Sequence, residues 1–219
     1  MIMTPLENNH IDKTKSAPRI ANFMLKLPSK LTVFDTETTG TGKDALIVSY
    51  GSVELDLITN EISDHFEIFV DPELSEEEIG TYEEYAYKVT NIAIPGMTNC
   101  DAHKFVDKRA FTETICARLR KIENMIAHNA TFDKRMLDQT LLLETSFLES
   151  LEIELFCSLQ LSRKTFDKDQ VGSFSLDSLC THTGVDNSSR KFHGALLDAE
   201  LTAEYLIKIN ERNLLDIRS

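Results

Sequence analysis

Hydrophobic and polar positions divide the first part of the chain into three expected strands. Residues 31–34 form a short apolar run, which is typical of a buried strand. Residues 46–56 and 61–70 follow, with partly alternating apolar and polar positions, and residues 57–60 separate them as a turn. We therefore expect a strand at 31–35 and a β-hairpin after it.

The rest of the chain alternates between helical and strand patterns. One helix is indicated by apolar residues at helical spacing, namely Phe111, Ile115, Leu119 and Ile122. Further elements are expected in this order: a surface helix or loop in the acidic stretch 73–84, strands at 125–127 and 151–157, and helices at 130–143, 158–164, 175–183 and 194–209. Strands in a meander followed by this alternation indicate an α/β fold with a mixed central sheet flanked by helices.

The composition is that of a globular protein, with 42% hydrophobic and 27% charged residues. No apolar run is long enough to cross a membrane, and the N-terminus lacks the apolar core of a secretory signal. The four cysteines are scattered without a Cys-x-x-Cys pair, which indicates neither a zinc site nor a disulfide framework. Reduced thiols in a cytoplasmic enzyme are the simplest expectation.

The chain is expected to hold one folded domain. Residues 1–28 lack periodicity, which favours a flexible or loosely packed extension over a docking segment. We expect the domain at 29–213 and a short C-terminal tail at 214–219.

Candidate chemistry begins where the first strand ends. Asp35 and Glu37 lie two residues apart, so on a strand their side chains project to the same face. Two adjacent carboxylates repel each other unless a cation lies between them, and oxygen ligands suit Mg²⁺ or Mn²⁺. Alone, this common spacing favours an ordinary strand end that runs into a polar turn over a metal site.

Two later segments extend the pattern. Residues 126–133 read Ile-Ala-His-Asn-Ala-Thr-Phe-Asp, and residues 193–198 read His-Gly-Ala-Leu-Leu-Asp. The order of the polar residues is Asp35, Glu37, Asp133, His193, Asp198. This pattern resembles the DnaQ-like exonucleases, the DEDDh branch of the ribonuclease H-like superfamily. Within it, Ser175–Cys180 and Lys191–Ala199 are most similar to the epsilon proofreading subunit of bacterial DNA polymerase III.

The resemblance implies a fold, an activity and a role for each residue. The fold would be ribonuclease H-like, with a mixed five-stranded sheet flanked by helices. The activity would be 3′→5′ exonuclease hydrolysis with two Mg²⁺ or Mn²⁺ ions, releasing nucleoside 5′-monophosphates. Asp35 would bridge both ions, with Glu37 and Asp198 at the first and Asp133 at the second. His193 would be the general base, because an unperturbed imidazole titrates near neutral pH.

Five further residues are candidates for binding the substrate. Thr38, Thr39 and Gly40 form a turn whose backbone can approach the terminal nucleotide, although ordinary turn formation explains the same residues. His128 and Asn129 are equally compatible with substrate contact and with fixing the turn that presents Asp133.

Substrate and partners remain open at this stage. We expect a single-stranded or frayed 3′ end, DNA rather than RNA, with an RNA exonuclease of the same fold and a non-catalytic polymerase-associated subunit as alternatives. The net charge of −13 argues against tight binding to long duplex DNA and favours help from a partner, such as a DNA polymerase or a clamp. Residues 213–217 are only faintly like a clamp-binding peptide. Relatives usually carry His-Gly where this chain has Ile94-Pro95-Gly96-Met97, a histidine that contributes to their nucleotide pocket.

Overall fold

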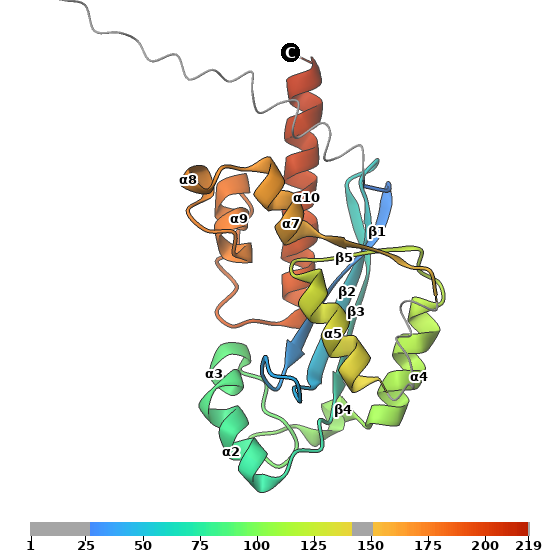
Figure 1. The fold of residues 1–219 in the computed structure, drawn as a ribbon, viewed down its shortest axis with the longest axis vertical. Helices are drawn as coiled ribbons and strands as arrows, with labels where there is room; N and C mark the ends of the chain where they lie inside the picture. Colours follow the sequence, from blue (N-terminus) through green and yellow to red (C-terminus); the bar gives the residue numbers. More distant parts are fainter. Residues whose placement is uncertain (1–26, 142–150, 219) are drawn as a thin grey trace, which may run out of the picture.

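A six-stranded mixed sheet forms the centre of the computed structural model, which describes residues 27–141 and 151–218 (Figure 1). The strands are β1 (Lys30–Thr38), β2 (Ile47–Asp56), β3 (Glu61–Val70), β4 (Phe105–Val106), β5 (Asn124–Ala127) and β6 (Glu154–Cys157). Their order across the sheet is β4-β3-β2-β1-β5-β6. β1, β2 and β3 pair antiparallel, whereas β5, β6 and β4 each join a parallel neighbour.

The predicted α/β class with a mixed sheet is confirmed, and the strand count is six rather than five. The additional strand, β4, has only two residues, and it pairs Phe105 with Phe69 of β3. Two residues are too few to produce a detectable alternation, so the sequence pattern could not reveal it. The expected extension at 1–28 lies almost wholly outside the described residues.

Helices cover both faces of the sheet. The helices are α2 (Glu76–Glu84), α3 (Ala86–Thr90), α4 (Lys108–Leu119), α5 (Ala130–Thr140), α7 (Ser158–Thr165), α8 (Lys168–Val171), α9 (Leu176–Thr183) and α10 (Ala195–Arg218). Alternate residues of β1 enter two separate cores. Val33 packs with residues of α9 and α10, and Phe34 packs with residues of α4 and α5. The central strand therefore presents one side to each helical layer.

Capping residues decide where several helices begin. The Asp107 side chain accepts a hydrogen bond from Ala110 N at 2.7 Å, which starts α4 three residues before the expected position. Ser175 caps α9, in agreement with the helix expected at 175–183, and Gly184 ends it at φ 82°. Helix α10 continues to Arg218, so residues 214–218, expected as a tail, are helical.

The acidic stretch forms helix α2, which begins with a capping box between Ser75 and Glu78. Helices α2 and α3 pack over a small core that contains Val48, Tyr82 and Ile94. The segment after α3, residues 94–97, is a turn in which Met97 N donates to Ile94 O at 3.0 Å. Among the described helices, none has the length and apolar character needed to cross a bilayer.

A glycine in β2 sets how closely α10 approaches the sheet. Gly51 pairs with Asp35 of β1, and a Cβ atom at this position would collide with backbone atoms of Ala195 and Leu196. Only a residue without a side chain allows this contact. The first turn of α10, which carries Asp198, therefore packs directly beside Asp35.

Candidate active site

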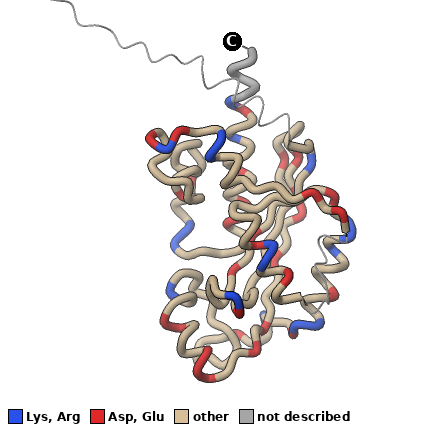
Figure 2. The backbone as a smooth tube through the Cα atoms, in the orientation of Figure 1, with Lys and Arg blue, Asp and Glu red and all other residues tan. Residues whose placement is uncertain are grey.

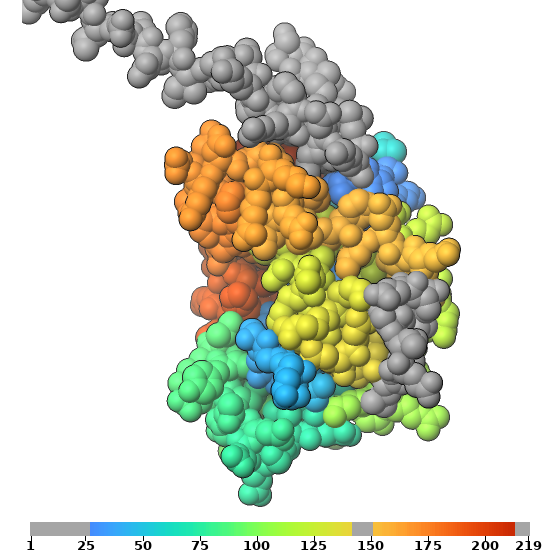
Figure 3. All heavy atoms as spheres, in the orientation of Figure 1, coloured from blue at the N-terminus to red at the C-terminus, as the bar shows by residue number. Residues whose placement is uncertain are grey.

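A cavity of about 920 Å³ opens at the carboxyl end of β1. Strands β1 and β5 are parallel, so the segments that follow them meet at one edge of the sheet. Figure 3 shows the turn after β1 lying between α5 and the α2–α3 segment. All ten residues singled out from the sequence line this cavity: Asp35, Glu37, Thr38, Thr39, Gly40, His128, Asn129, Asp133, His193 and Asp198.

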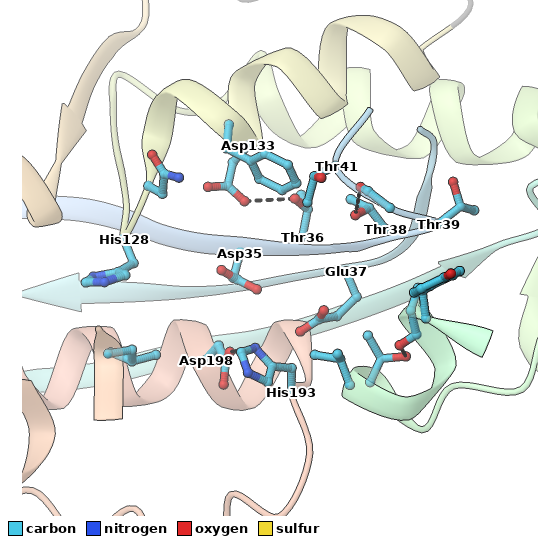
Figure 4. Close-up of a pocket in the computed structure, with 18 of the residues that line it drawn as sticks. Asp35, Thr36, Glu37, Thr38, Thr39, Thr41, His128, Asp133, His193 and Asp198 are labelled. Atoms are coloured by element: carbon cyan, nitrogen blue, oxygen red, sulfur yellow. Dashed lines mark hydrogen bonds and ion pairs between the residues drawn. The ribbon is translucent and has the colours of Figure 1, made fainter. Parts of the chain in front are cut away.

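The α10 side of the cavity holds a compact group of possible metal ligands. Asp35 and Glu37 point from β1 toward the start of α10 (Figure 4), as their spacing requires. Glu37, His193 and Asp198 each offer one ligand atom, and these three atoms lie within 4.8 Å of one another. Glu37 and Asp198 are buried, whereas His193 is exposed at the mouth of the cavity.

Asp133 enters the cavity from the other helical layer. It lies in the first turn of α5, and its side chain accepts a hydrogen bond from Thr36 Oγ1 at 2.8 Å. Burial raises the pKa of Asp133 to about 7, although the hydrogen bond from Thr36 acts in the opposite direction. The site therefore draws carboxylates from both sides of β1.

The carboxylates strongly disfavour one another's ionisation. Burial raises the pKa of Asp35 well above its ordinary value, and the charges of Asp133, Glu37 and Asp198 raise it further. Burial and the neighbouring Asp198 raise the pKa of Glu37 to about 8. In the part of the chain that the structure describes, Glu37 Oε1 is buried without a hydrogen-bond partner. Buried carboxylates with an unsatisfied oxygen fit divalent cations as ligands.

Arg190, which was not selected from the sequence, also occupies this group. Its guanidinium donates to both carboxylate oxygens of Asp198, at 2.6 and 2.5 Å, and to Asp177 at 2.7 Å. It also lies 2.9 Å from His193 Nδ1. The position three residues before His193 is the one sequence signal that could have indicated it.

The backbone holds His193 against helix α3, because His193 N donates to Val89 O at 3.0 Å. Its Nδ1 atom lies 3.5 Å from Asp198 Oδ2. Burial lowers the pKa of His193, and the charge of Arg190 lowers it further. A neutral imidazole is the form that can accept a proton.

Among the candidate substrate-binding residues, Thr38, Thr39, Gly40 and His128 have hydrogen-bond partners within the protein. Thr38 Oγ1 donates to Gly40 O at 2.6 Å, and Thr39 Oγ1 accepts from Leu46 N at 3.0 Å. His128 Nε2 lies 3.0 Å from Phe174 O, which ties the turn after β5 to the loop before α9. These contacts favour turn formation, and contact with a substrate stays a prediction.

Comparison with known families identifies the chain. The profile of the RNase_T family, described as "Exonuclease", matches residues 32–206. The chain belongs to this DnaQ-like exonuclease family. Membership confirms the predicted enzyme class, a 3′→5′ exonuclease, and implies divalent metal ions at the site.

Two relatives illustrate the similarity within the family. The DNA polymerase III subunit epsilon of Rickettsia prowazekii is 31% identical over 186 residues, covering 81% of this chain and 72% of the relative. The subunit of the same name from Salmonella typhimurium is 32% identical over 186 residues, covering 78% and 68% respectively.

Solved structures show the same fold. An exonuclease I structure aligns with a TM-score of 0.65 at 16% identity, covering 84% of this chain and 41% of that protein. The chain thus spans less than half of that exonuclease. Exonuclease X, solved in complex with 5′ overhanging duplex DNA, aligns with a TM-score of 0.55 at 23% identity and covers 83% and 92%.

Proposed function

We propose that this protein is a metal-dependent 3′→5′ exonuclease that removes nucleotides from DNA 3′ ends in proofreading or repair. The observation that carries the proposal is the grouping of Glu37, His193 and Asp198 within 4.8 Å, in a cavity that Asp35 and Asp133 also line. The polymerase subunits found among its relatives favour DNA as the substrate.

The charge of the cavity supports a requirement for cations. Among the described residues that line it, six are acidic and Arg190 is the one lysine or arginine. Figure 2 shows acidic and basic positions interspersed over the coloured part of the chain. A phosphodiester approaching this cavity would be repelled unless bound cations reversed the local charge.

Each polar side chain has a role in this proposal. Asp35, Glu37, Asp133 and Asp198 would hold the divalent ions, two per site, with Mg²⁺ or Mn²⁺ as the fitting ions. When bound, such ions stabilise charge on the phosphoryl oxygens and favour ionisation of the attacking water. His193, exposed at the cavity mouth, would accept the proton of that water.

The non-reacting part of the strand end would be held by the walls of the cavity. The turn Thr38–Gly40 offers backbone atoms on one side, and Gly40 leaves open space there. Tyr85 and Val89 of the α2–α3 segment are exposed apolar residues that also line the cavity. They provide an apolar surface for a base, which suits a single-stranded or frayed end.

Release of nucleotides from labelled strands tests the proposal. With Mg²⁺, the protein should release nucleoside 5′-monophosphates from single-stranded DNA with a 3′-hydroxyl, and Asp35→Asn should abolish the release. Circular dichroism would show that the variant is folded. Absence of release by the folded, Mg²⁺-supplied protein would contradict the proposal.

The same nucleotide-release assay distinguishes DNA from RNA as the substrate, and a separate co-purification experiment tests for a partner. An RNA strand of matched sequence degraded faster than the DNA would make the protein an RNA exonuclease. A mismatched 3′ end removed faster than a paired one would support proofreading. Co-purification of a DNA polymerase from the native cells would supply the partner that the relatives' names suggest.

A further inference from the structure

Arg190 makes contacts that are unusual for a residue at a metal site. Its guanidinium binds Asp198 through two parallel hydrogen bonds, the geometry that aligns arginine best with a carboxylate. Both side chains are nearly inaccessible, at 6% exposure for Arg190 and 5% for Asp198. This is a buried, specific ion pair rather than a surface contact.

The same guanidinium also binds His193, the candidate general base. A guanidinium only donates hydrogen bonds, so His193 Nδ1, at 2.9 Å, must accept with its lone pair. That lone pair is then not available for a proton. A single side chain therefore engages a candidate metal ligand and the candidate base at the same time.

A divalent ion bound to Asp198 would compete with Arg190 for the same carboxylate oxygens. Two cations in contact with one carboxylate repel each other, most strongly where solvent is excluded. Asp177 offers the guanidinium a second anchor at 2.7 Å, and this carboxylate is 53% exposed. A contact with Asp177 would therefore remain for Arg190 if its bonds to Asp198 were broken.

The chain around Arg190 permits this movement. Arg190 lies in the loop between α9 and α10, where Ser188, Ser189 and Lys191 are exposed. Its backbone N–H donates within the loop, to Asn187 O at 3.0 Å. Displacing the side chain requires no rearrangement of either hydrophobic core.

We propose that Arg190 is a positioning residue that holds Asp198 and His193 in the metal-free enzyme and leaves both when a divalent ion binds. Metal binding then releases the lone pair of His193 in the same event. In the metal-free enzyme the Arg190 guanidinium supplies the positive charge beside Asp198, and the divalent ion takes over that role when it binds. This inference rests on the proposed function, because it requires that the site binds divalent ions.

Calorimetric titration of the full chain with Mn²⁺, without nucleic acid, tests the competition. Arg190→Gln should bind Mn²⁺ about 10- to 100-fold more tightly than the unchanged protein, the factor expected for losing a hydrogen-bonded charged competitor. Arg109→Gln is the matched control, because Arg109 is exposed and its ion pair is with Glu113 on α4, away from the cavity. It should leave the affinity unchanged.

The outcomes distinguish the two proposals. If the unchanged protein binds no Mn²⁺, the proposed function fails and this inference fails with it. If the unchanged protein binds Mn²⁺ and Arg190→Gln binds it equally or more weakly, only the inference is overturned. Arg190→Lys keeps the charge but loses the two parallel hydrogen bonds. Its Mn²⁺ affinity should therefore lie between that of the unchanged protein and that of Arg190→Gln.

Thermal unfolding gives a second readout. In EDTA, Arg190→Gln should unfold at a lower temperature than the unchanged protein, because Asp198 loses its counter-charge. Saturating Mn²⁺ should close most of that gap, since the ion supplies the missing charge. If Arg190→Gln lowered the unfolding temperature equally in EDTA and in Mn²⁺, the role of Arg190 would be purely structural and the inference would be overturned.

Discussion

The raised pKa of Glu37 predicts that the metal-free protein loses stability as the pH rises. Glu37 holds its proton more tightly in the folded state, with a pKa of about 8, than in the unfolded chain, where it is 4.5. Between these values unfolding releases a proton, so stability is full below the lower pKa and falls as the pH rises through the upper one.

The size of this effect follows from the two pKa values. From pH 5.5 to 8, the Glu37 contribution to the free energy of unfolding should fall by roughly 3 kcal/mol, because each pH unit in this range changes it by at most about 1.4 kcal/mol. Asp133, with a pKa raised to about 7, acts in the same direction. His128 and His193, whose pKa values are lowered, act in the opposite direction. A comparison with Glu37→Gln isolates the Glu37 share.

Chemical denaturation in EDTA at several pH values measures the effect. Far-UV circular dichroism is the suitable signal, because the chain contains no tryptophan. Between pH 5.5 and 8, the free energy of unfolding of Glu37→Gln should fall by about 3 kcal/mol less than that of the unchanged protein. The control is Glu83→Gln, at an exposed position on α2. Its free energy of unfolding should fall by as much as that of the unchanged protein. Saturating Mg²⁺ should remove most of the pH dependence. A flat profile in EDTA, or parallel losses in the Glu37 variant and the unchanged protein, would refute the reasoning.

Three further predictions follow from the site and its support. His193→Gln should lower the rate of nucleotide release about 100-fold or more, yet leave Mn²⁺ affinity by calorimetry nearly unchanged; a large loss of affinity would make His193 a metal ligand instead. Gly51→Ala should cost about 1–3 kcal/mol of unfolding free energy in urea, because the new methyl group meets the α10 backbone; Gly80→Ala, which meets nothing within 4 Å, should not. EDTA should stop nucleotide release, and added Mg²⁺ should restore it; persistence in EDTA would exclude a metal requirement.

Local patterns in the sequence carry most of the fold. The helix expected at 175–183 is confirmed as α9, because its capping residues Ser175 and Gly184 act on backbone atoms adjacent in the chain. Apolar spacing alone placed the start of α4 too late, because the Asp107 cap begins the helix before its first buried residue. Strand β4 could not be predicted, because its two residues are extended by pairing with β3 rather than by their own pattern.

The site divides in the same way. Alternation along a strand gives the common direction of Asp35 and Glu37, and the structure adds Asp133, His193 and Asp198 to the same cavity. Their roles stay predictions. The position of Arg190 depends on a long side chain crossing from a loop to Asp177 and Asp198 at once. No spacing rule encodes such a contact, since it arises only after α9 and α10 have packed.

The order of the site residues along the chain has a consequence for protein synthesis. Asp35 and Glu37 leave the ribosome early, and β1 can pair with β2 long before α10 has been made. A chain translated only as far as β2 therefore carries Asp35 and Glu37 and lacks Asp133, His193 and Asp198. The proposed site would be complete only when the first turn of α10 has been translated and has packed against Gly51.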